Sequence, residues 1–302
     1  MVLKVSNPVD YEYVDNMDKI EFSKICKSAE KRLADAGVYS ALAEVEIIWE
    51  YLLEVDRLNV YLHGAELVDD KIIKRFNQIV DKRVTRYPLQ LILGEAYFYG
   101  RRFVVTPDVM VPTPETELLC ELAINYIKNE NIKNPDILDI GVGSGVISVT
   151  VASELPDAKL TAVDISDKAI EVAKENANNH TVTDRVDFIL SDRFKNVSSG
   201  KKFDLILSNP PYISEDEYKE LPPEVLADPK ISLVSGLKGI DMIELLTSEA
   251  PDYMKENGRL MFEIGYNQAE LVYELTGKDN RYKSITMLKD LNDIDRVVIL
   301  SI

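Results

Sequence analysis

The sequence predicts an α/β protein with a mostly parallel sheet, preceded by a small all-helical domain. Three observations support this fold class. Apolar residues first recur at helical spacing, then alternate as in a hairpin, and after residue 117 strand-like and helical stretches alternate. A chain of 302 residues is long enough for two domains of about 150 residues. We therefore expect a helical domain at 1–86, a β-hairpin linker at 87–112 and an α/β domain at 113–302.

The first part of the chain carries apolar residues three or four positions apart, which is the pattern of helices that share a core. These residues are Ile25, Ala29, Leu33, Val45, Ile48, Leu52, Ile72, Phe76 and Ile79. Gly37, Gly64 and the pair Asp69-Asp70 interrupt the pattern where helices are expected to stop or start. The residues of this domain indicate a structural scaffold and suggest no catalytic site.

The segment that follows changes to the period of a strand. Tyr97, Tyr99, Phe103 and Val105 alternate with polar or glycine positions, and Gly100-Arg101 separates the two halves. This alternation predicts a β-hairpin between the two domains.

Strands and helices then alternate to the end of the chain. The expected strands cover 136–140, 160–163, 186–190, 203–208 and 259–264, and a helix over 166–178 has Ser166 as its N-cap. Alternation of this kind predicts right-handed βαβ units and a parallel sheet with helices on both faces. Two further strands, 284–288 and 296–300, are joined by a short link and should pair antiparallel.

The charge balance and the residue composition indicate which kinds of partner and which cellular compartment to expect. The chain carries 35 basic and 52 acidic side chains, a net charge of −17, which favours a protein substrate over a stable nucleic-acid partner. No apolar run approaches the roughly 20 residues of a membrane span, and the N-terminus lacks the pattern of a secretion signal. The two cysteines are far apart and suggest no metal site. A reduced, cytoplasmic protein is expected.

A glycine-rich turn links the first strand of the α/β domain to the next helix. It reads Asp139-Ile140-Gly141-Val142-Gly143-Ser144-Gly145, and its glycines let a ligand approach the backbone. A dinucleotide fingerprint counted from Gly141 would need glycine where the chain has Val146. The Gly-Lys-Ser/Thr sequence of a phosphate-binding P-loop is also missing.

Acidic residues follow the next two strands. Asp164 is placed to accept the ribose hydroxyls of an adenosine, and Asp192 to accept the adenine amine, with Arg193 beside the ring. For each acid alone, a solvated loop charge or an N-cap is the favoured interpretation. Together with Asp139 they end three successive strands, at the edge where ligands of such sheets bind, which indicates an adenosine-containing cofactor.

The tetrapeptide Asn209-Pro210-Pro211-Tyr212 follows a buried strand at 203–208. Two prolines stiffen this turn, so the Asn209 side-chain oxygen and the Pro210 carbonyl become two fixed hydrogen-bond acceptors. An amide nitrogen is a poor nucleophile unless its N–H groups are held and its lone pair is aimed at the electrophile. Tyr212 would stack on the flat target group. If the electrophile is the methyl group of a sulfonium cofactor, it is reactive enough that the amide nitrogen needs no strong general base. An ordinary strand-terminating turn is the alternative interpretation.

With these motifs in place, the sequence resembles the release-factor glutamine methyltransferase family (HemK/PrmC) over nearly its full length. The resemblance includes the helical domain, residues 88–95, the stretch 112–117, the glycine turn, the Asn-Pro-Pro-Tyr turn, and Glu263-Ile264-Gly265 with Gln268. It implies a Rossmann-like methyltransferase fold with seven strands, the last one reversed, and a helical domain that recognises the substrate. The implied reaction is transfer of a methyl group from S-adenosylmethionine to N5 of the glutamine in the Gly-Gly-Gln motif of peptide-chain release factors. S-adenosylhomocysteine would be the product, and the protein is expected to be a monomer.

The resemblance also implies roles for individual residues. The cofactor would contact Asp139, Gly141, Val142, Gly143, Ser144, Gly145, Asp164, Asp192, Arg193 and Asn209. The glutamine would contact Asn209, Pro210, Pro211 and Tyr212, of which Asn209, Pro210 and Tyr212 would be catalytic. Two positions depart from the family pattern: Thr113 stands where the family has arginine, and Arg193 where many members have an apolar or aromatic residue.

Three other functions compete with this interpretation. A glutamine methyltransferase of a ribosomal protein would use the same turn. A nucleic-acid base amino-methyltransferase would usually carry a basic groove and extra recognition elements, and the acidic balance and the absence of a target-recognition insert disfavour it. A cofactor-binding protein without catalysis would be expected to have lost Asn209 or the prolines, and both are present.

Overall fold

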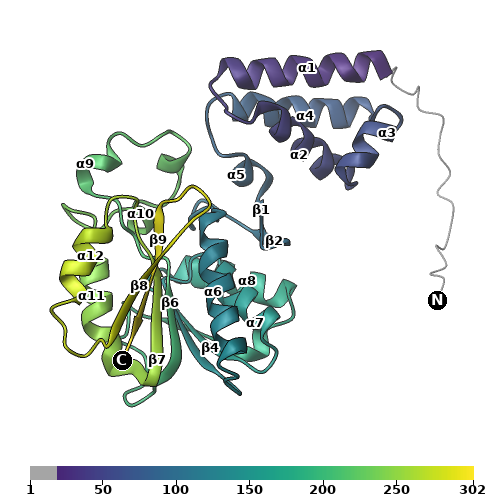
Figure 1. Cartoon of the computed structure of the whole chain (residues 1–302). Helices are drawn as coiled ribbons and strands as arrows, with labels where there is room; N and C mark the ends of the chain where they lie inside the picture. Colours follow the sequence, from purple (N-terminus) through teal and green to yellow (C-terminus); the bar gives the residue numbers. More distant parts are fainter. Residues whose placement is uncertain (1–18) are drawn as a thin grey trace, which may run out of the picture. The chain divides into compact units, whose positions relative to one another are not determined.

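A computed structural model of the chain describes residues 19–302 (Figure 1). The first 18 residues of the expected helical domain lie outside the described residues. Contacts divide the chain into two compact units, one ending at Leu93 and one spanning Gly94–Ile302, and each is described by itself. None of the helices within residues 19–302 combines the length and the apolar character that crossing a membrane requires.

The first unit is built from helices. Their bounds are α1 Lys19–Asp35, α2 Ala41–Leu53, α3 Arg57–Leu67, α4 Asp70–Arg83 and α5 Leu89–Leu93. Asp56 and Asp69 cap α3 and α4 by accepting backbone N–H groups, as the turn signals in the sequence predict for Asp69. In the core Trp49 stacks on Phe76 at a centroid distance of 4.0 Å. The apolar positions with helical spacing therefore supply this core, as expected.

Gly64 corrects one detail of the sequence interpretation. It lies within α3 and does not end a helix. A Cβ atom on Gly64 would lie 2.7 Å from the ring of Phe22, so the glycine permits close packing between α3 and α1.

The second unit opens with a hairpin of β1 (Glu95–Phe98) and β2 (Arg101–Val104), paired antiparallel. Its turn consists of Tyr99 and Gly100, both with positive φ (51° and 70°), as in a type I′ turn. Tyrosine is unusual in this conformation. The Glu117 carboxylate accepts the N–H of Tyr99 at 2.6 Å and supports the turn, a contact that local sequence does not reveal.

The remaining strands form one seven-stranded sheet. Their bounds are β3 Asp136–Ile140, β4 Lys159–Asp164, β5 Val186–Leu190, β6 Phe203–Ser208, β7 Met254–Glu263, β8 Ser284–Lys289 and β9 Asp295–Ser301. The order across the sheet is β5-β4-β3-β6-β7-β9-β8, and β9 alone runs opposite to the other six strands. This confirms the predicted mostly parallel sheet with a reversed last strand.

One strand begins earlier than the sequence suggested. β7 starts at Met254, five residues before the predicted start, because it carries an irregularity: its register against β6 shifts between Phe203 and Leu205. Asn257 lies there in the left-handed region (φ 65°), followed by Gly258. These two residues resemble a turn in sequence, although they lie within the strand.

Helices cover both faces of the sheet (Figure 1). On one face lie α6 (Glu115–Asn129), α7 (Val146–Glu154) and α8 (Asp167–Asn179), and on the other α11 (Asp241–Glu249) and α12 (Ala269–Thr276). Alternate residues of each strand point to opposite cores: Ile137 packs with the first set and Leu138 with the second. Short elements complete the unit: α9 Glu215–Tyr218, α10 Lys230–Leu233, and 3-10 turns at Thr183–Arg185, Val225–Ala227 and Ala250–Tyr253.

A buried asparagine on α8 ties the hairpin to the sheet. The Asn176 side chain accepts the N–H of Val104 at 2.8 Å and donates to the carbonyl groups of Val104 (2.9 Å) and Ser144 (2.8 Å). Asn176 is fully buried, and removing its side chain would leave these three backbone groups without this partner, of which the Ser144 carbonyl forms a buried bond.

We therefore expect Asn176→Ala to lower the free energy of unfolding by about 2–4 kcal/mol, since it leaves buried backbone groups unpaired. Asn179→Ala, at an exposed position of the same helix, should change it by less than about 0.5 kcal/mol. Urea unfolding of both variants measures the difference. Equal stability of the two variants would contradict the anchoring role.

Candidate active site

The register of β3 with both its neighbours brings three loops together at the carboxyl edge of the sheet. Ile140, the last residue of β3, pairs with Val163 of β4 and with Ser208 of β6. The Ser208 hydroxyl donates to the Ile140 carbonyl at 2.8 Å, which fixes this register at its end. The glycine turn, Asp164 and the Asn-Pro-Pro-Tyr turn therefore begin side by side.

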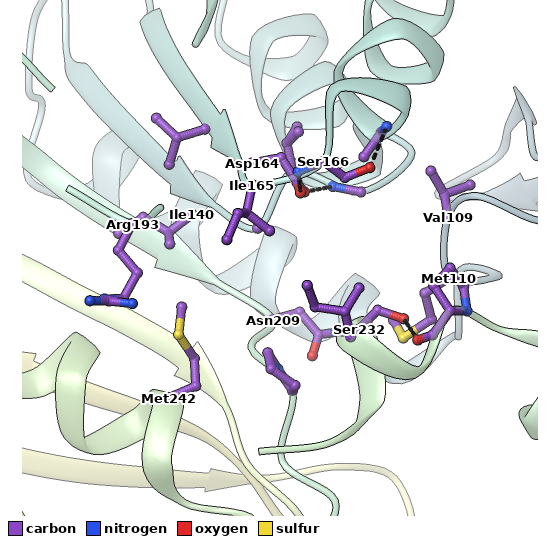
Figure 2. A pocket seen from close by; sticks show the side chains of 18 of the residues that line it. Val109, Met110, Ile140, Asp164, Ile165, Ser166, Arg193, Asn209, Ser232 and Met242 are labelled. Atoms are coloured by element: carbon purple, nitrogen blue, oxygen red, sulfur yellow. Dashed lines mark hydrogen bonds between the residues drawn. The ribbon is translucent and has the colours of Figure 1, made fainter. Parts of the chain in front are cut away.

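A cavity of about 390 Å³ opens at this edge (Figure 2). Residues from the sheet loops line it, together with a loop before α6 and the segment between β6 and β7. Figure 2 shows Asp164, Ile165 and Ser166 on one side of the cavity and Asn209, Ser232 and Met110 on another. Of the predicted site residues, the cavity wall includes Gly141, Val142, Gly143, Ser144, Asp164, Asp192, Arg193, Asn209 and Pro211.

The glycines of the turn have different surroundings. Gly141 and Gly143 line the cavity, and a Cβ on Gly143 would meet no atom within 4 Å. Gly145 does not belong to the wall: it precedes α7, and a Cβ there would lie 3.1 Å from both Cα and Cβ of Ala173 on α8. Gly145 thus allows two helices to approach, while the other two leave room for a ligand.

Asp164 is largely buried and holds its own loop and the glycine turn. One carboxylate oxygen accepts the N–H of Gly143 and the other that of Ser166, each at 2.9 Å. Burial raises the pKa of Asp164, and the backbone N–H groups of Gly143 and Ser166 oppose that shift. Each oxygen keeps a further lone pair that can accept a hydroxyl of a ligand in the cavity.

Asp192 and Arg193 form the far wall of the cavity. The Lys195 ammonium lowers the pKa of Asp192 most, and the Arg193 guanidinium lowers it further. The Arg193 guanidinium also pairs with Glu249 at 3.3 Å, and its side chain is only 17% exposed. Arg193 is therefore fixed against the cavity by two carboxylates and does not extend into solvent.

Asp139 lies behind the glycine turn, outside the cavity wall. It is fully buried and accepts the Ser148 hydroxyl through Oδ2, while Oδ1 has no hydrogen-bond partner among the described residues. Burial raises the pKa of Asp139 to about 7, and the Ser148 hydrogen bond opposes this shift. Through this hydrogen bond the Asp139 carboxylate holds the first turn of α7 against the end of β3.

The Asn-Pro-Pro-Tyr turn presents only part of itself to the cavity. Asn209 and Pro211 line the wall, Pro210 is buried, and the Tyr212 ring packs against the second core. The Asn209 Nδ2 atom donates to the Thr116 hydroxyl at 3.0 Å. The side-chain Oδ1 of Asn209 is thereby left free to accept.

Gln268 holds the far end of this turn. Its Nε2 group donates to the carbonyl groups of Tyr212 and Gly239, both at 2.8 Å, and its Oε1 atom accepts the N–H of Gly265 at 2.8 Å. All three bonds are made by one buried amide, so three loops are locked together behind the turn. Burial raises the pKa of Tyr212 to about 12, so its phenol stays neutral even well above physiological pH.

Several parts of the wall were not predicted from sequence, among them two loop segments and Asp241, Met242 and Leu245 of α11. Residues Asp108–Pro112 and the stretch around Pro229–Gly236 carry no local motif of a binding site, yet they close the cavity opposite the sheet loops. The N–H of Val111 donates to the Asp228 carboxylate at 3.1 Å and joins the two segments. Thr116 was also missed, although it belongs to a stretch that carries the family resemblance. Thr113, the departure from the family pattern, is exposed and outside the wall.

A seven-stranded sheet with one reversed strand, a glycine turn and a carboxylate after the second strand define a Rossmann-like methyltransferase. Residues 117–236 match the model of the methyltransferase small domain, and residues 24–94 match that of the PrmC N-terminal domain. Within residues 19–302 no cluster of His, Cys, Asp or Glu is suited to hold a metal ion.

Comparison with known proteins identifies the family. The chain is 35% identical to the release factor glutamine methyltransferase of Aquifex aeolicus, over 95% of this chain and 97% of that one. It is 38% identical to the release factor glutamine methyltransferase of Fusobacterium nucleatum, over 87% of this chain and 74% of that one. A solved methyltransferase from Pyrococcus furiosus shares the fold with a TM-score of 0.50 at 18% identity, over 76% of this chain and 98% of that one. The chain belongs to the release factor glutamine methyltransferase family.

The two glycine environments predict different costs of substitution. Both residues have positive φ, 53° at Gly143 and 85° at Gly145, so alanine at either should cost roughly 1–2 kcal/mol in backbone strain. Gly145→Ala should cost more, because its Cβ must also displace α8. Urea unfolding of the two variants measures the difference, and equal losses would refute the separate roles.

The buried Asp139 predicts a dependence of stability on pH. Since its folded-state pKa, about 7, lies above that of an unfolded aspartate, its contribution is most favourable at low pH. It is lost as pH rises through 7. We expect the free energy of unfolding of the wild type, relative to Asp139→Asn, to fall between pH 5 and pH 8. Denaturant titrations at several pH values test this, and a constant difference would contradict it.

Proposed function

We propose that this protein transfers a methyl group from S-adenosylmethionine to the side-chain amide nitrogen of the glutamine in the Gly-Gly-Gln motif of peptide-chain release factors. Membership of the family supports the reaction. The single structural observation that carries the proposal is the orientation of Asn209, whose nitrogen is bound to Thr116 and whose oxygen is free at the cavity.

Two acceptors are what an amide substrate requires. The lone pair of an amide nitrogen is delocalised, so the nitrogen attacks poorly unless both N–H bonds are held and the lone pair is directed. In the proposed mechanism the Asn209 oxygen accepts one N–H, and the carbonyl of buried Pro210 accepts the other. We assign the flat face of the amide to Tyr212, whose ring borders the second core and lies outside the cavity wall. Positioning of this kind supplies roughly 7–11 kcal/mol in the most favourable model reactions.

The cavity fits an adenosine-containing sulfonium. Its wall combines glycine positions open to a ligand with Asp164, which has lone pairs free for hydroxyl groups, and with the half-buried Asp192. We assign the contacts with the cofactor to these residues, to Val142, Ser144 and Arg193, and to the cavity face of Asn209. Asp139 and Gly145 do not contact the cofactor in this assignment; they support the glycine turn and α7 from outside the cavity wall. S-adenosylmethionine, when bound, supplies an electrophilic methyl group and leaves as S-adenosylhomocysteine.

No residue of the wall is needed as a strong base. The substrate nitrogen loses its proton only as or after the new bond forms, so it need not be deprotonated beforehand. Tyr212, whose pKa is about 12, would be a poor acceptor at neutral pH. The chain has only two histidines, His63 and His180, and neither lines the cavity. Because release factors act in protein synthesis, we place the reaction in the cytoplasm.

The substrate class can be tested by a methyl-transfer assay with labelled S-adenosylmethionine. The substrates to compare are a release factor, its variant with Gln→Ala in the Gly-Gly-Gln motif, a ribosomal protein, and duplex DNA or RNA. We expect label on the intact release factor only. Equal label on the Gln→Ala variant would end the glutamine hypothesis, and label on DNA or RNA would favour a base methyltransferase.

A substitution tests the role of Asn209. We expect Asn209→Ala to weaken S-adenosylmethionine binding much less than it slows turnover, which should fall at least tenfold, equivalent to about 1.4 kcal/mol in the activation barrier. The loss follows because one of the two acceptors for the substrate N–H groups is gone. Calorimetry and steady-state kinetics measure the two effects, with Asn179→Ala on the exposed face of α8 as the control. Unchanged turnover would rule out the assigned role.

A further inference from the structure

A primary amide has two ends of nearly the same shape, so Asn209 could turn either its oxygen or its nitrogen to the cavity. We propose that Thr116 and Glu263 are positioning residues that fix this choice. In this arrangement the Glu263 carboxylate accepts the Thr116 hydroxyl proton, Thr116 accepts from Asn209 Nδ2, and Asn209 Oδ1 is left for the substrate. The inference rests on the proposed function and extends it to two residues that do not touch the substrate.

Thr116 is held firmly enough to select an orientation. It lies in the first turn of α6, is only 2% exposed, and its backbone N–H donates to the Thr113 carbonyl at 3.2 Å. Its hydroxyl oxygen lies 3.0 Å from Asn209 Nδ2. The two residues are 93 positions apart in sequence, so this contact depends on the packing of α6 across the end of β6.

Glu263 lies directly beside this pair. It is the last residue of β7, and the preceding residue, Phe262, pairs with Ser208 immediately before Asn209. Glu263 is 1% exposed, and neither of its carboxylate oxygens has a hydrogen-bond partner among the described residues. The Thr116 hydroxyl is close enough to lower the pKa of this carboxyl. A buried carboxylate without partners needs a donor, and a turn of the Thr116 side chain toward Glu263 would supply one.

The ionised carboxylate sets the direction of the whole chain of hydrogen bonds. A threonine hydroxyl has one proton to donate, and an ionised carboxylate can only accept. With the Thr116 proton directed at Glu263, the Thr116 oxygen can only accept from Asn209, which must then offer its nitrogen. If the hydroxyl were free to turn, it could donate to Asn209 Oδ1. The amide nitrogen would then face the N–H donors of the substrate, and binding would be lost.

Protonation of Glu263 should weaken this control. The groups that face the carboxyl are Glu115 on α6, Tyr212 after β6 and Arg296 on β9, besides Thr116, and Cys120 lies near it on α6. Burial raises the pKa of Glu263 to about 7; Thr116 and Arg296 oppose the shift and Glu115 adds to it. Below this pH the carboxyl carries its own proton and can donate, so turnover should fall as pH falls through about 7.

Paired substitutions at Thr116 test the positioning role in the full-length protein, with a release factor and labelled S-adenosylmethionine. Thr116→Val keeps the shape and removes the hydroxyl, while Thr116→Ser keeps the hydroxyl. We expect Thr116→Val to lower kcat at least about tenfold with S-adenosylmethionine affinity unchanged by calorimetry, and Thr116→Ser to retain most of the turnover. Wild-type kcat in Thr116→Val, equal loss in both variants, or a loss of cofactor affinity would each overturn the proposal.

The part played by Glu263 has a separate readout. The kcat of the wild type should fall on the acid side of about pH 7, and Glu263→Gln, which cannot ionise, should show a flat profile over the same range. The same acid-side fall in both proteins would remove Glu263 from the inference. A wild type that labels no release factor overturns the proposed function and this inference with it. An active wild type matched by Thr116→Val overturns the inference alone.

Discussion

The pairing of β3 with two parallel neighbours is the constraint on which the site depends. Because Ile140 ends level with Val163 and Ser208, the chain leaves three strands at one edge, and the residues that follow have to share the space beyond it. A Cβ on Gly141 would come 4.0 Å from the backbone oxygen of Asn209. A slip of this register by one residue would reverse the faces of the strand and separate the glycine turn from the Asn-Pro-Pro-Tyr turn.

Features that depend on residues a few positions apart could be predicted from the sequence. The apolar runs of β3 and β6, and the Ser166 cap of α8, depend on neighbours a few residues away, and the structure contains them within one or two residues of the expected bounds. The antiparallel pairing of β8 and β9 followed from a link too short for a parallel crossover, and the family resemblance indicated that the last strand is the reversed one. Likewise, the glycine turn and Asn209 could be placed at the cavity because each follows a recognisable strand.

What could not be predicted depends on contacts between distant parts of the chain. Thr116 meets Asn209 across 93 positions, and the Val111 N–H meets Asp228 across 117, so neither contact leaves a periodic signal. The sequence also could not tell a glycine that faces a ligand from one that faces a helix. Gly145 looks the same as Gly143 in the motif, yet only the approach of Ala173 on α8 explains it.

Two buried carboxylates show how the site obtains its rigidity. Asp139, the next-to-last residue of β3, and Glu263, the last residue of β7, both lie behind the cavity wall, and burial raises the pKa of each to about 7. Removing such groups from water opposes folding at neutral pH, so their presence needs a local benefit. Each carboxylate faces one hydroxyl, Ser148 or Thr116, at the start of a helix that borders the cavity. A reaction that depends on aiming a weak nucleophile gains from such fixed supports, because a small rotation of Asn209 would misdirect the substrate lone pair.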